Sequence, residues 1–78
     1  MIEIRLPQWG MGMQEGTIVR WLKAEGDSVE KGEDIVEVES AKVNEMVQAP
    51  AAGRIVRLIA AEGETVAVQA VLAELDPV

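Results

Sequence analysis

An internal repeat constrains the fold of this chain more than any other feature of its sequence. Residues 16–39 overlay residues 53–76 at a shift of 37 positions, and nine of the 24 aligned pairs are identical. Two repeats are too few for a solenoid, which needs three or more stacked units. Two similar half-sheets can instead bury their apolar faces against each other. The repeat therefore predicts an all-β fold, a flattened β-barrel or sandwich of two small antiparallel sheets related by a pseudo-twofold axis.

Short segments rich in Val and Ile, separated by turn residues, predict strands rather than helices. The expected strands cover residues 2–6, 17–22, 35–39, 43–49, 54–59 and 71–75, with a short strand near Val66. Each repeat also contains a Glu-Gly-acid triplet, centred on Gly26 in the first and on Gly63 in the second. We expect the two glycines to adopt equivalent conformations, with positive φ at one or both, where alanine would cost at least about 1 kcal/mol.

Composition excludes several classes of function. The chain has 78 residues, which is one small domain, and it contains neither Cys nor His. It therefore has no disulfide, no thiolate zinc site and no Ser-His-Asp arrangement. Fourteen acidic against seven basic residues give a net charge of −7, which disfavours binding to nucleic acid. We expect a non-catalytic carrier or binding domain over residues 1–76, with residues 77–78 starting a linker or tail.

The join between the two repeats is the most distinctive position in the chain. The first repeat ends at Glu39, and a strongly β-prone segment starts at Val43. Two strands this close in sequence can pair only as an antiparallel hairpin, so Lys42 is expected at or beside its tip. The residues alone leave open an ordinary exposed lysine, since Lys23 and Lys31 also lie beside turns.

Short motifs follow one another along almost the whole chain. They are Leu6-Pro7, Glu15-Gly16, Glu25-Gly26-Asp27 with Val29, Lys31-Gly32, Glu39-Ser40-Ala41-Lys42-Val43, Ala49-Pro50 with Gly53, and Glu62-Gly63 with Val66. In this order and spacing they resemble the lipoyl domains of dihydrolipoyl acyltransferases from 2-oxo acid dehydrogenase complexes. The resemblance implies lipoate attached covalently to Lys42, with Glu39, Ala41 and Val43 in the recognised turn. It implies no catalytic residue and no metal site.

Two sequence features bear on which partner the domain has and on whether it carries lipoate or biotin. Many lipoyl domains have Asp immediately before the modified lysine, where this chain has Ala41, so the partner decarboxylase is less defined. Biotinyl carrier domains share the fold, but their lysine typically lies between two methionines. Lys42 lies instead between Ala41 and Val43, with Glu39 three residues before it. A biotinyl carrier of a carboxylase and an unmodified barrel acting as an interaction module are the alternatives.

The resemblance also implies partners. A lipoate ligase or lipoyl transferase would attach the cofactor, and a thiamine-diphosphate-dependent decarboxylase component would acylate it. An acyltransferase core and dihydrolipoyl dehydrogenase would complete the cycle. The loop over residues 7–13 is most similar to that of acetoin dehydrogenase and related bacterial members. The domain is expected to be a monomer that acts without nucleic acid or membrane, in the bacterial cytoplasm or, after removal of a transit peptide, in an organelle matrix.

The Gly-rich loop after the first strand contains Trp9, Met11 and Met13. These side chains either cap the end of the barrel or form an adaptable contact surface for a partner, and the two roles can be divided among them. In the resembling family this loop lies close to the lipoyl turn and helps to choose the partner. Shifting Arg5 by 37 positions gives Lys42, so a uniform repeat would start this loop at the counterpart of the lysine turn.

Three further patterns carry smaller expectations. Trp21 lies in a strand pattern and is expected in the core, with a partner for its indole N–H. Glu45 shares strand parity with the apolar Val43 and Val47, which predicts a position near the open end of the barrel. An acidic run around the turns is expected to be a solvated face, because its spacing fits no EF-hand loop; it consists of Glu25, Asp27, Glu30, Glu33 and Asp34.

Overall fold

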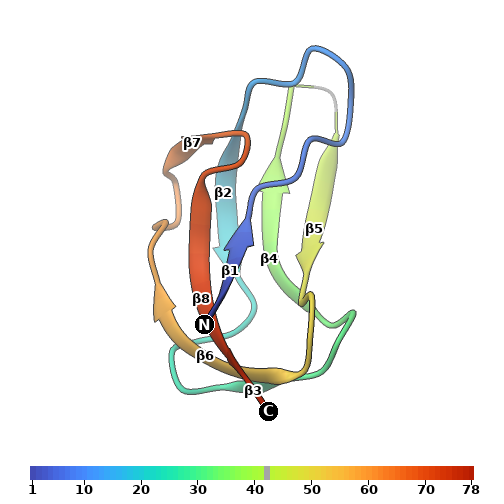
Figure 1. Cartoon of the computed structure of the whole chain (residues 1–78). Coiled ribbons are helices and arrows are strands. Elements are labelled where there is room, and N and C mark those ends of the chain that lie inside the picture. The colour runs from blue at the N-terminus through green and yellow to red at the C-terminus, as the bar shows by residue number, and fades with distance from the viewer. Residues whose placement is uncertain (42) are drawn as a thin grey trace.

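The computed structural model describes residues 1–41 and 43–78, and it contains no helix within them (Figure 1). Its strands are β1 (Ile2–Arg5), β2 (Glu15–Trp21), β3 (Ser28–Val29), β4 (Asp34–Glu39), β5 (Asn44–Gln48), β6 (Gly53–Leu58), β7 (Thr65–Ala67) and β8 (Val71–Pro77). They form two four-stranded antiparallel sheets with the orders β1-β8-β6-β3 and β5-β4-β2-β7. The sheets pack face to face as a flattened sandwich of 35 × 21 × 17 Å. The predicted all-β fold is confirmed.

The pseudo-twofold relation between the halves is present in the strand pairing. In the first half β2 pairs with β4, where Thr17 lies opposite Glu39. In the second half β6 pairs with β8, where Arg54 lies opposite Asp76. Each of these residues lies 37 positions from its counterpart, and both pairings skip one residue at equivalent places in β2 and β6. The two halves therefore have the equivalent registers that the repeat predicts.

The edge strands β1 and β5 are also counterparts, but at a different shift. Ile2 of β1 lies opposite Leu75, and Glu45 of β5 lies opposite Val38. Since Leu75 and Val38 are counterparts at the shift of 37, Ile2 corresponds to Glu45 at a shift of 43. The repeat thus includes both edge strands. The shift between counterparts is 43 residues for β1 and β5, and 37 residues from β2 and β6 onward.

This change of shift corrects the predicted counterpart of the lysine turn. At a shift of 43, Arg5 corresponds to Gln48 at the end of β5 and not to Lys42. The prediction is wrong because it assumed one shift along the whole chain. The loop after β1 has its counterpart in the connection after β5, where Pro50 corresponds to Pro7.

The change of shift lies in these two connections. In the first, Pro7 and Gly16 are nine residues apart in sequence. In the second, Pro50 and Gly53 are three residues apart. The first connection joins edge strand β1 to β2, and the second joins edge strand β5 to β6. Each connection crosses from one sheet to the other. The loop between β1 and β2 therefore contains an insertion of six residues.

Gly26 and Gly63 form equivalent turns, as the repeat predicts. Both have positive φ, at 93° and 85°. The Gly26 amide donates to the carbonyl oxygen of Ile55 at 2.7 Å, and the Gly63 amide donates to that of Ile18 at 2.6 Å. Because Ile18 and Ile55 are themselves counterparts, each turn is bound in the same way to a strand of the other half.

The acidic residues at these turns have a structural role in addition to solvation. Glu25 accepts a hydrogen bond from the Leu58 amide, and its counterpart Glu62 accepts one from the Trp21 amide, each at 2.9 Å. The carboxylate of Asp27 accepts a bond from the amide three residues earlier. The run predicted as a solvated face therefore also closes turns and joins the halves. Within residues 1–41 and 43–78 no three carboxylates gather as a metal site would require.

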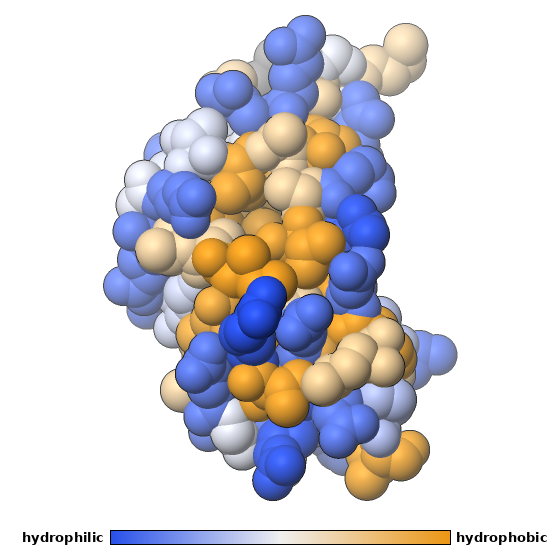
Figure 2. Space-filling view, turned by 60° about the vertical axis from the view of Figure 1, so that its left-hand side comes forward, coloured by the Kyte–Doolittle hydropathy of each residue, from blue (hydrophilic) through white to orange (hydrophobic). Residues whose placement is uncertain are grey.

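The core between the sheets is formed by apolar side chains. Its buried members are Ile4, Leu6, Ile18, Val29, Ile35, Val36, Val38, Val47, Ala49, Ile55, Ala60, Leu72, Ala73 and Leu75, and no described polar side chain is buried with them. Trp21 packs against this core and donates its indole N–H to the Ala60 carbonyl oxygen at 2.8 Å, as predicted. Some apolar surface stays outside, and Figure 2 shows it gathered in the middle of one face with hydrophilic side chains around it.

The strands differ from the prediction by one or two residues at most of their ends and by one additional strand, β3. The sequence pattern does not predict β3, because two residues show no alternation, although β3 is the counterpart of the predicted strand around Val66. β8 continues through Pro77, which lies opposite Gly53, so it extends two residues beyond the predicted strand end at Leu75. No helix of the described chain is long and apolar enough for a membrane span.

Candidate functional site

A tight hairpin joins β4 to β5 at one end of the sandwich. Ser40 closes it, because its amide and its hydroxyl both donate to the carbonyl oxygen of Val43, at 2.8 and 2.9 Å. The strands pair up to the base of the turn, where Glu39 lies opposite Asn44. The hairpin predicted at the join of the repeats is confirmed. Lys42, the predicted attachment residue, lies outside the described residues.

The predicted recognition residues around Lys42 are accessible. Glu39 and Ala41 are exposed, and Val43 keeps 48% of its surface in solvent although it is apolar. An enzyme that approaches the hairpin from its end can contact these exposed side chains. Their role in recognition stays a prediction.

The loop between β1 and β2 is folded around one turn. The Met13 amide donates to the carbonyl oxygen of Gly10 at 3.2 Å, and Gly12 has a φ of 84°. These features define a type II turn, in which a glycine takes the third position and Met11 the second. The Gln8 side-chain amide also donates to the Met13 carbonyl oxygen, at 3.3 Å. The turn therefore presents Met11 at the tip of the loop.

The three apolar side chains of this loop differ in burial. Trp9 and Met13 are partly buried and pack against the core, so they cap the end of the sandwich. Met11 has a relative exposure of 103% and makes no contribution to the core. Composition alone could not separate them, because all three are large and apolar. The signal in the sequence was the position of Met11 between Gly10 and Gly12, which is typical of a turn.

The loop and the hairpin line one groove of about 1020 Å³. Its lining consists of residues 9–17 together with Glu39, Ser40, Ala41, Val43 and Glu45. Both segments lie at the end of the sandwich drawn uppermost in Figure 1. The prediction that the loop lies near this turn is confirmed for the described residues. The inserted residues form most of the loop side of the groove.

The charged side chains among the described lining residues of the groove are acidic. They are Glu15, Glu39 and Glu45, and its described lining residues include no Lys or Arg. Glu45 is exposed and lies near the open end of the sandwich, as its strand parity predicts. These three carboxylates contribute negative charge to this end, which favours partner surfaces of the opposite sign.

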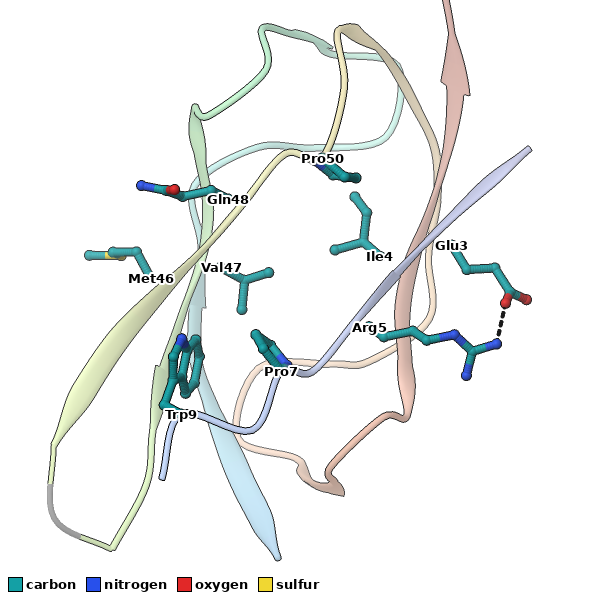
Figure 3. A pocket seen from close by; sticks show the side chains of 9 residues that line it. All are labelled: Glu3, Ile4, Arg5, Pro7, Trp9, Met46, Val47, Gln48 and Pro50. Atoms are coloured by element: carbon teal, nitrogen blue, oxygen red, sulfur yellow. Dashed lines mark hydrogen bonds and ion pairs between the residues drawn. The ribbon is translucent and has the colours of Figure 1, made fainter. Parts of the chain in front are cut away.

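A smaller cavity of about 260 Å³ lies between β1 and β5, the edge strands of the two sheets (Figure 3). Ile4 and Val47, which are counterparts at the shift of 43, point toward each other across it. Pro7 and Trp9 lie together at one end of the cavity. Trp9 lines both this cavity and the groove, so its indole anchors the loop at the boundary between them.

Comparison with known proteins agrees with this geometry. The family model described as "Biotin-requiring enzyme" matches residues 2–75, and the chain belongs to this family of biotinyl and lipoyl carrier domains. Among solved structures, the chain is similar to the lipoyl domain of the 2-oxoglutarate dehydrogenase complex from Azotobacter vinelandii. The TM-score is 0.79 and the identity 34%, over 97% of this chain and 96% of that one.

Curated relatives narrow the family further. An acetyltransferase component of the acetoin cleaving system of Pseudomonas putida is 41% identical over 70 residues, which is 90% of this chain. The succinyltransferase component of the 2-oxoglutarate dehydrogenase complex of Staphylococcus saprophyticus is 50% identical over 68 residues, 87% of this chain. The chain spans 19% and 16% of the length of these relatives. Within its family it is a lipoyl domain.

Proposed function

We propose that this domain carries lipoate on Lys42 and moves acyl groups and reducing equivalents between the active sites of a 2-oxo acid or acetoin dehydrogenase complex. The hairpin between β4 and β5 carries the proposal. It is closed by Ser40, its described residues Ala41 and Val43 are exposed, and it extends the end of a sandwich with an apolar core. A lysine in such a turn can be offered to several enzyme clefts in succession.

The surroundings of Lys42 fit a covalently attached arm. Ala41 is small and exposed, and the hairpin opens on a groove rather than on a packed surface. When attached, lipoate supplies a dithiolane that accepts an acyl group and two electrons and gives them up again. The chain's own part is presentation: Ser40 closes the hairpin, Glu39 and Val43 flank it, and the two sheets support it. Amide formation would also remove the positive charge of the lysine.

We propose that the domain has no catalytic activity of its own, which the lack of Cys and His supports. The proposed partners are a lipoate ligase or lipoyl transferase, a thiamine-diphosphate-dependent decarboxylase, an acyltransferase core and dihydrolipoyl dehydrogenase. The names of the relatives, from acetoin cleaving and 2-oxoglutarate dehydrogenase systems, support this set. Tethering would replace diffusion of a free intermediate by a high effective concentration.

The loop between β1 and β2 is proposed to select the decarboxylase without taking part in attachment of the arm. It forms one side of the groove, and the hairpin forms the other. Any enzyme that encloses the hairpin far enough to acylate an arm on it would therefore meet the loop. A ligase that recognises the turn through Glu39, Ala41 and Val43 needs no contact with it.

Reductive acylation tests the proposal. The lipoylated domain is incubated in turn with the decarboxylase component of an acetoin, a pyruvate and a 2-oxoglutarate system, each with its own substrate. We expect one component to add a single acyl group, and the component that does so identifies the substrate class. Failure of all three components to acylate a correctly lipoylated domain would contradict the proposal.

Ligase specificity separates lipoate from biotin. We expect lipoate ligase to add one lipoyl mass and biotin ligase to add nothing, since Ala41 and Val43 replace the methionines typical of biotinyl domains. Biotinylation without lipoylation would assign the domain to a carboxylase. An intact mass without any adduct after both reactions would favour an unmodified interaction module.

A further inference from the structure

We propose that Met11 is the residue of the groove that determines which decarboxylase binds, and that the partner receives it in an apolar pocket framed by basic side chains. This inference rests on the proposed function, because it requires a decarboxylase that acts on the lipoylated hairpin. Three observations carry it: how the loop holds Met11, what surrounds Met11, and where the other exposed apolar side chains lie.

The loop holds Met11 in solvent. Trp9 and Met13 pack against the core on either side of it, and the Gln8 side chain donates to the Met13 carbonyl oxygen. Gly12 supplies the positive φ that the type II turn requires. An apolar side chain at 103% exposure gains none of the free energy of burial, so the stability of the sandwich does not explain its presence.

Met11 lies in the inserted residues, which supports a role in binding and not in stabilising the fold. The second half joins equivalent strands in three steps, from Pro50 to Gly53, and has no turn of this kind. Residues that one half lacks without loss of the sandwich are not needed to build it. A preorganised loop with one projecting side chain is instead suited to binding, because little conformational entropy remains to be lost.

The surroundings of Met11 define the chemistry of the partner. Glu15, Glu39 and Glu45 line the same groove, and Val43 on the hairpin is half exposed. Interfaces usually have an apolar centre and a polar rim, and methionine is a flexible side chain that fits irregular pockets. The partner surface that complements this end has an apolar pocket with Lys or Arg side chains around it.

Other exposed apolar side chains provide a matched control. Ile59, at 42% exposure, does not line the groove. Ile59→Gln removes an exposed apolar side chain outside the groove, whereas Met11→Gln removes one that lines the groove, at nearly constant size. Met11→Leu keeps the apolar character and loses the thioether.

Steady-state kinetics with the three lipoylated variants test the inference. The acylating component found for the wild-type domain is used, and the domain is the varied substrate. We expect Met11→Gln to raise KM about tenfold with kcat within about twofold of wild type. Met11→Leu and Ile59→Gln should stay within about threefold of wild type in KM, and added salt should raise KM for every variant. A KM for Met11→Gln equal to that of wild type would overturn the inference.

Oxidative footprinting of the unlipoylated domain gives a readout that is independent of acylation. Hydrogen peroxide transfers one oxygen atom to the methionine sulfur, forming the sulfoxide and water. Met11 and Met1, at 103% and 75% exposure, should react fastest in the free domain. Excess decarboxylase should slow oxidation of Met11 about fivefold or more and leave Met1 unchanged.

The two failures are distinguishable. Equal oxidation of Met11 in the free and bound domain would refute the contact even when the lipoylated wild type is acylated normally. Absence of acylation of the lipoylated wild type by all three components would instead refute the proposed function and this inference with it.

Discussion

The two connections between the first and second strands of each half show what the fold requires and what has been added to it. Residues 50–53 join β5 to β6 in three steps, whereas residues 7–16 take nine steps to join the equivalent strands β1 and β2. The registers on either side are equivalent, so the short connection is sufficient for the sandwich. The six extra residues lie at the end with the hairpin and form one side of the groove. The second half of the chain thus shows which residues the sandwich needs, and comparison with it identifies the residues added in the first half.

The largest effect is expected from giving the first half the connection of the second. Replacing residues 8–15 by two alanines leaves Pro7-Ala-Ala-Gly16, which matches Pro50 to Gly53. Reductive acylation should fall tenfold or more, about the loss of one binding hot spot, while lipoylation continues. The free energy of unfolding should fall by about 1–3 kcal/mol, because Trp9 and Met13 lose their partly buried contacts.

Acylation rates, intact mass and thermal denaturation of this variant check the expectation. Wild-type acylation by the folded variant would show that the insertion serves no partner. Loss of lipoylation in a folded variant would show that the loop belongs to the ligase site and not to the decarboxylase site.

A second difference between the halves concerns Gly16 and Gly53, which are counterparts in the repeat. A Cβ at Gly53 would lie 2.4 Å from the carbonyl oxygen of Asp76, and one at Gly16 would lie 2.7 Å from Cγ1 of Val38. The backbone at Asp76 is held in the β6–β8 ladder, whereas a valine side chain can rotate. Gly53→Ala should therefore destabilise by about 3 kcal/mol and Gly16→Ala by about 1–2 kcal/mol. Urea denaturation measures both, and a larger cost at Gly16 would reverse the comparison.

The halves differ again at a turn that the repeat places at Gly32 and Gln69. Both residues have positive φ, at 86° and 73°, and both occupy the third position of a turn. Glycine adopts this conformation without strain, whereas Gln69 does not. Gln69→Gly should stabilise the domain by about 0.5–1 kcal/mol, and the reciprocal Gly32→Gln should destabilise it by about 1 kcal/mol. Destabilisation by Gln69→Gly would show that its side chain contributes more than the backbone strain costs.

The smallest effect is expected at the ion pair of the first half. Lys23 Nζ lies 2.6 Å from Glu33 Oε2, while Ala60 and Ala70 hold the counterpart positions. The hydrogen bond from Lys23 lowers the pKa of Glu33 below its ordinary 4.5, and the bond to Glu33 raises the pKa of Lys23 above 10.5. The stabilisation by Glu33 is therefore present above pH 4.5 and lost as the pH falls through its lowered pKa.

The stabilisation by Lys23 is present below pH 10.5 and lost as the pH rises through its raised pKa. In Lys23→Ala, titration of Glu33 by NMR should give a pKa closer to the ordinary value, and acid unfolding should depend less on pH. An unchanged pKa of Glu33 in that variant would assign its shift to the Glu30 amide, which also donates to this carboxylate.

The sheets were predictable because their determinants are local or repeated. Alternating Val and Ile residues define the strands, and the aligned Glu-Gly-acid triplets predict equivalent turns at Gly26 and Gly63. Comparison with the strand near Val66 could also have found β3, since the repeat aligns Val29 with Val66. Strand pattern alone could not, because two residues are too short to show a period.

The groove was predictable only in part. The hairpin follows from the spacing of two β-prone segments, but an inserted loop has no counterpart from which its path can be read. Contacts between distant segments decide that Trp9 and Met13 are partly buried and Met11 is not. The assumption of one shift made Arg5 the counterpart of Lys42, and only the pairing of β1 with β8 and of β5 with β4 reveals two shifts.

Mapping the lipoylated residue tests the central claim most directly. The domain is incubated with lipoate ligase, ATP and lipoate, and intact mass and peptide mapping are recorded for wild type and Lys42→Ala. The account predicts one lipoyl group on wild type, located on Lys42, and none on Lys42→Ala, with stabilities that differ by less than about 0.5 kcal/mol. A lipoyl group on Lys23 or Lys31, in either protein, would contradict it.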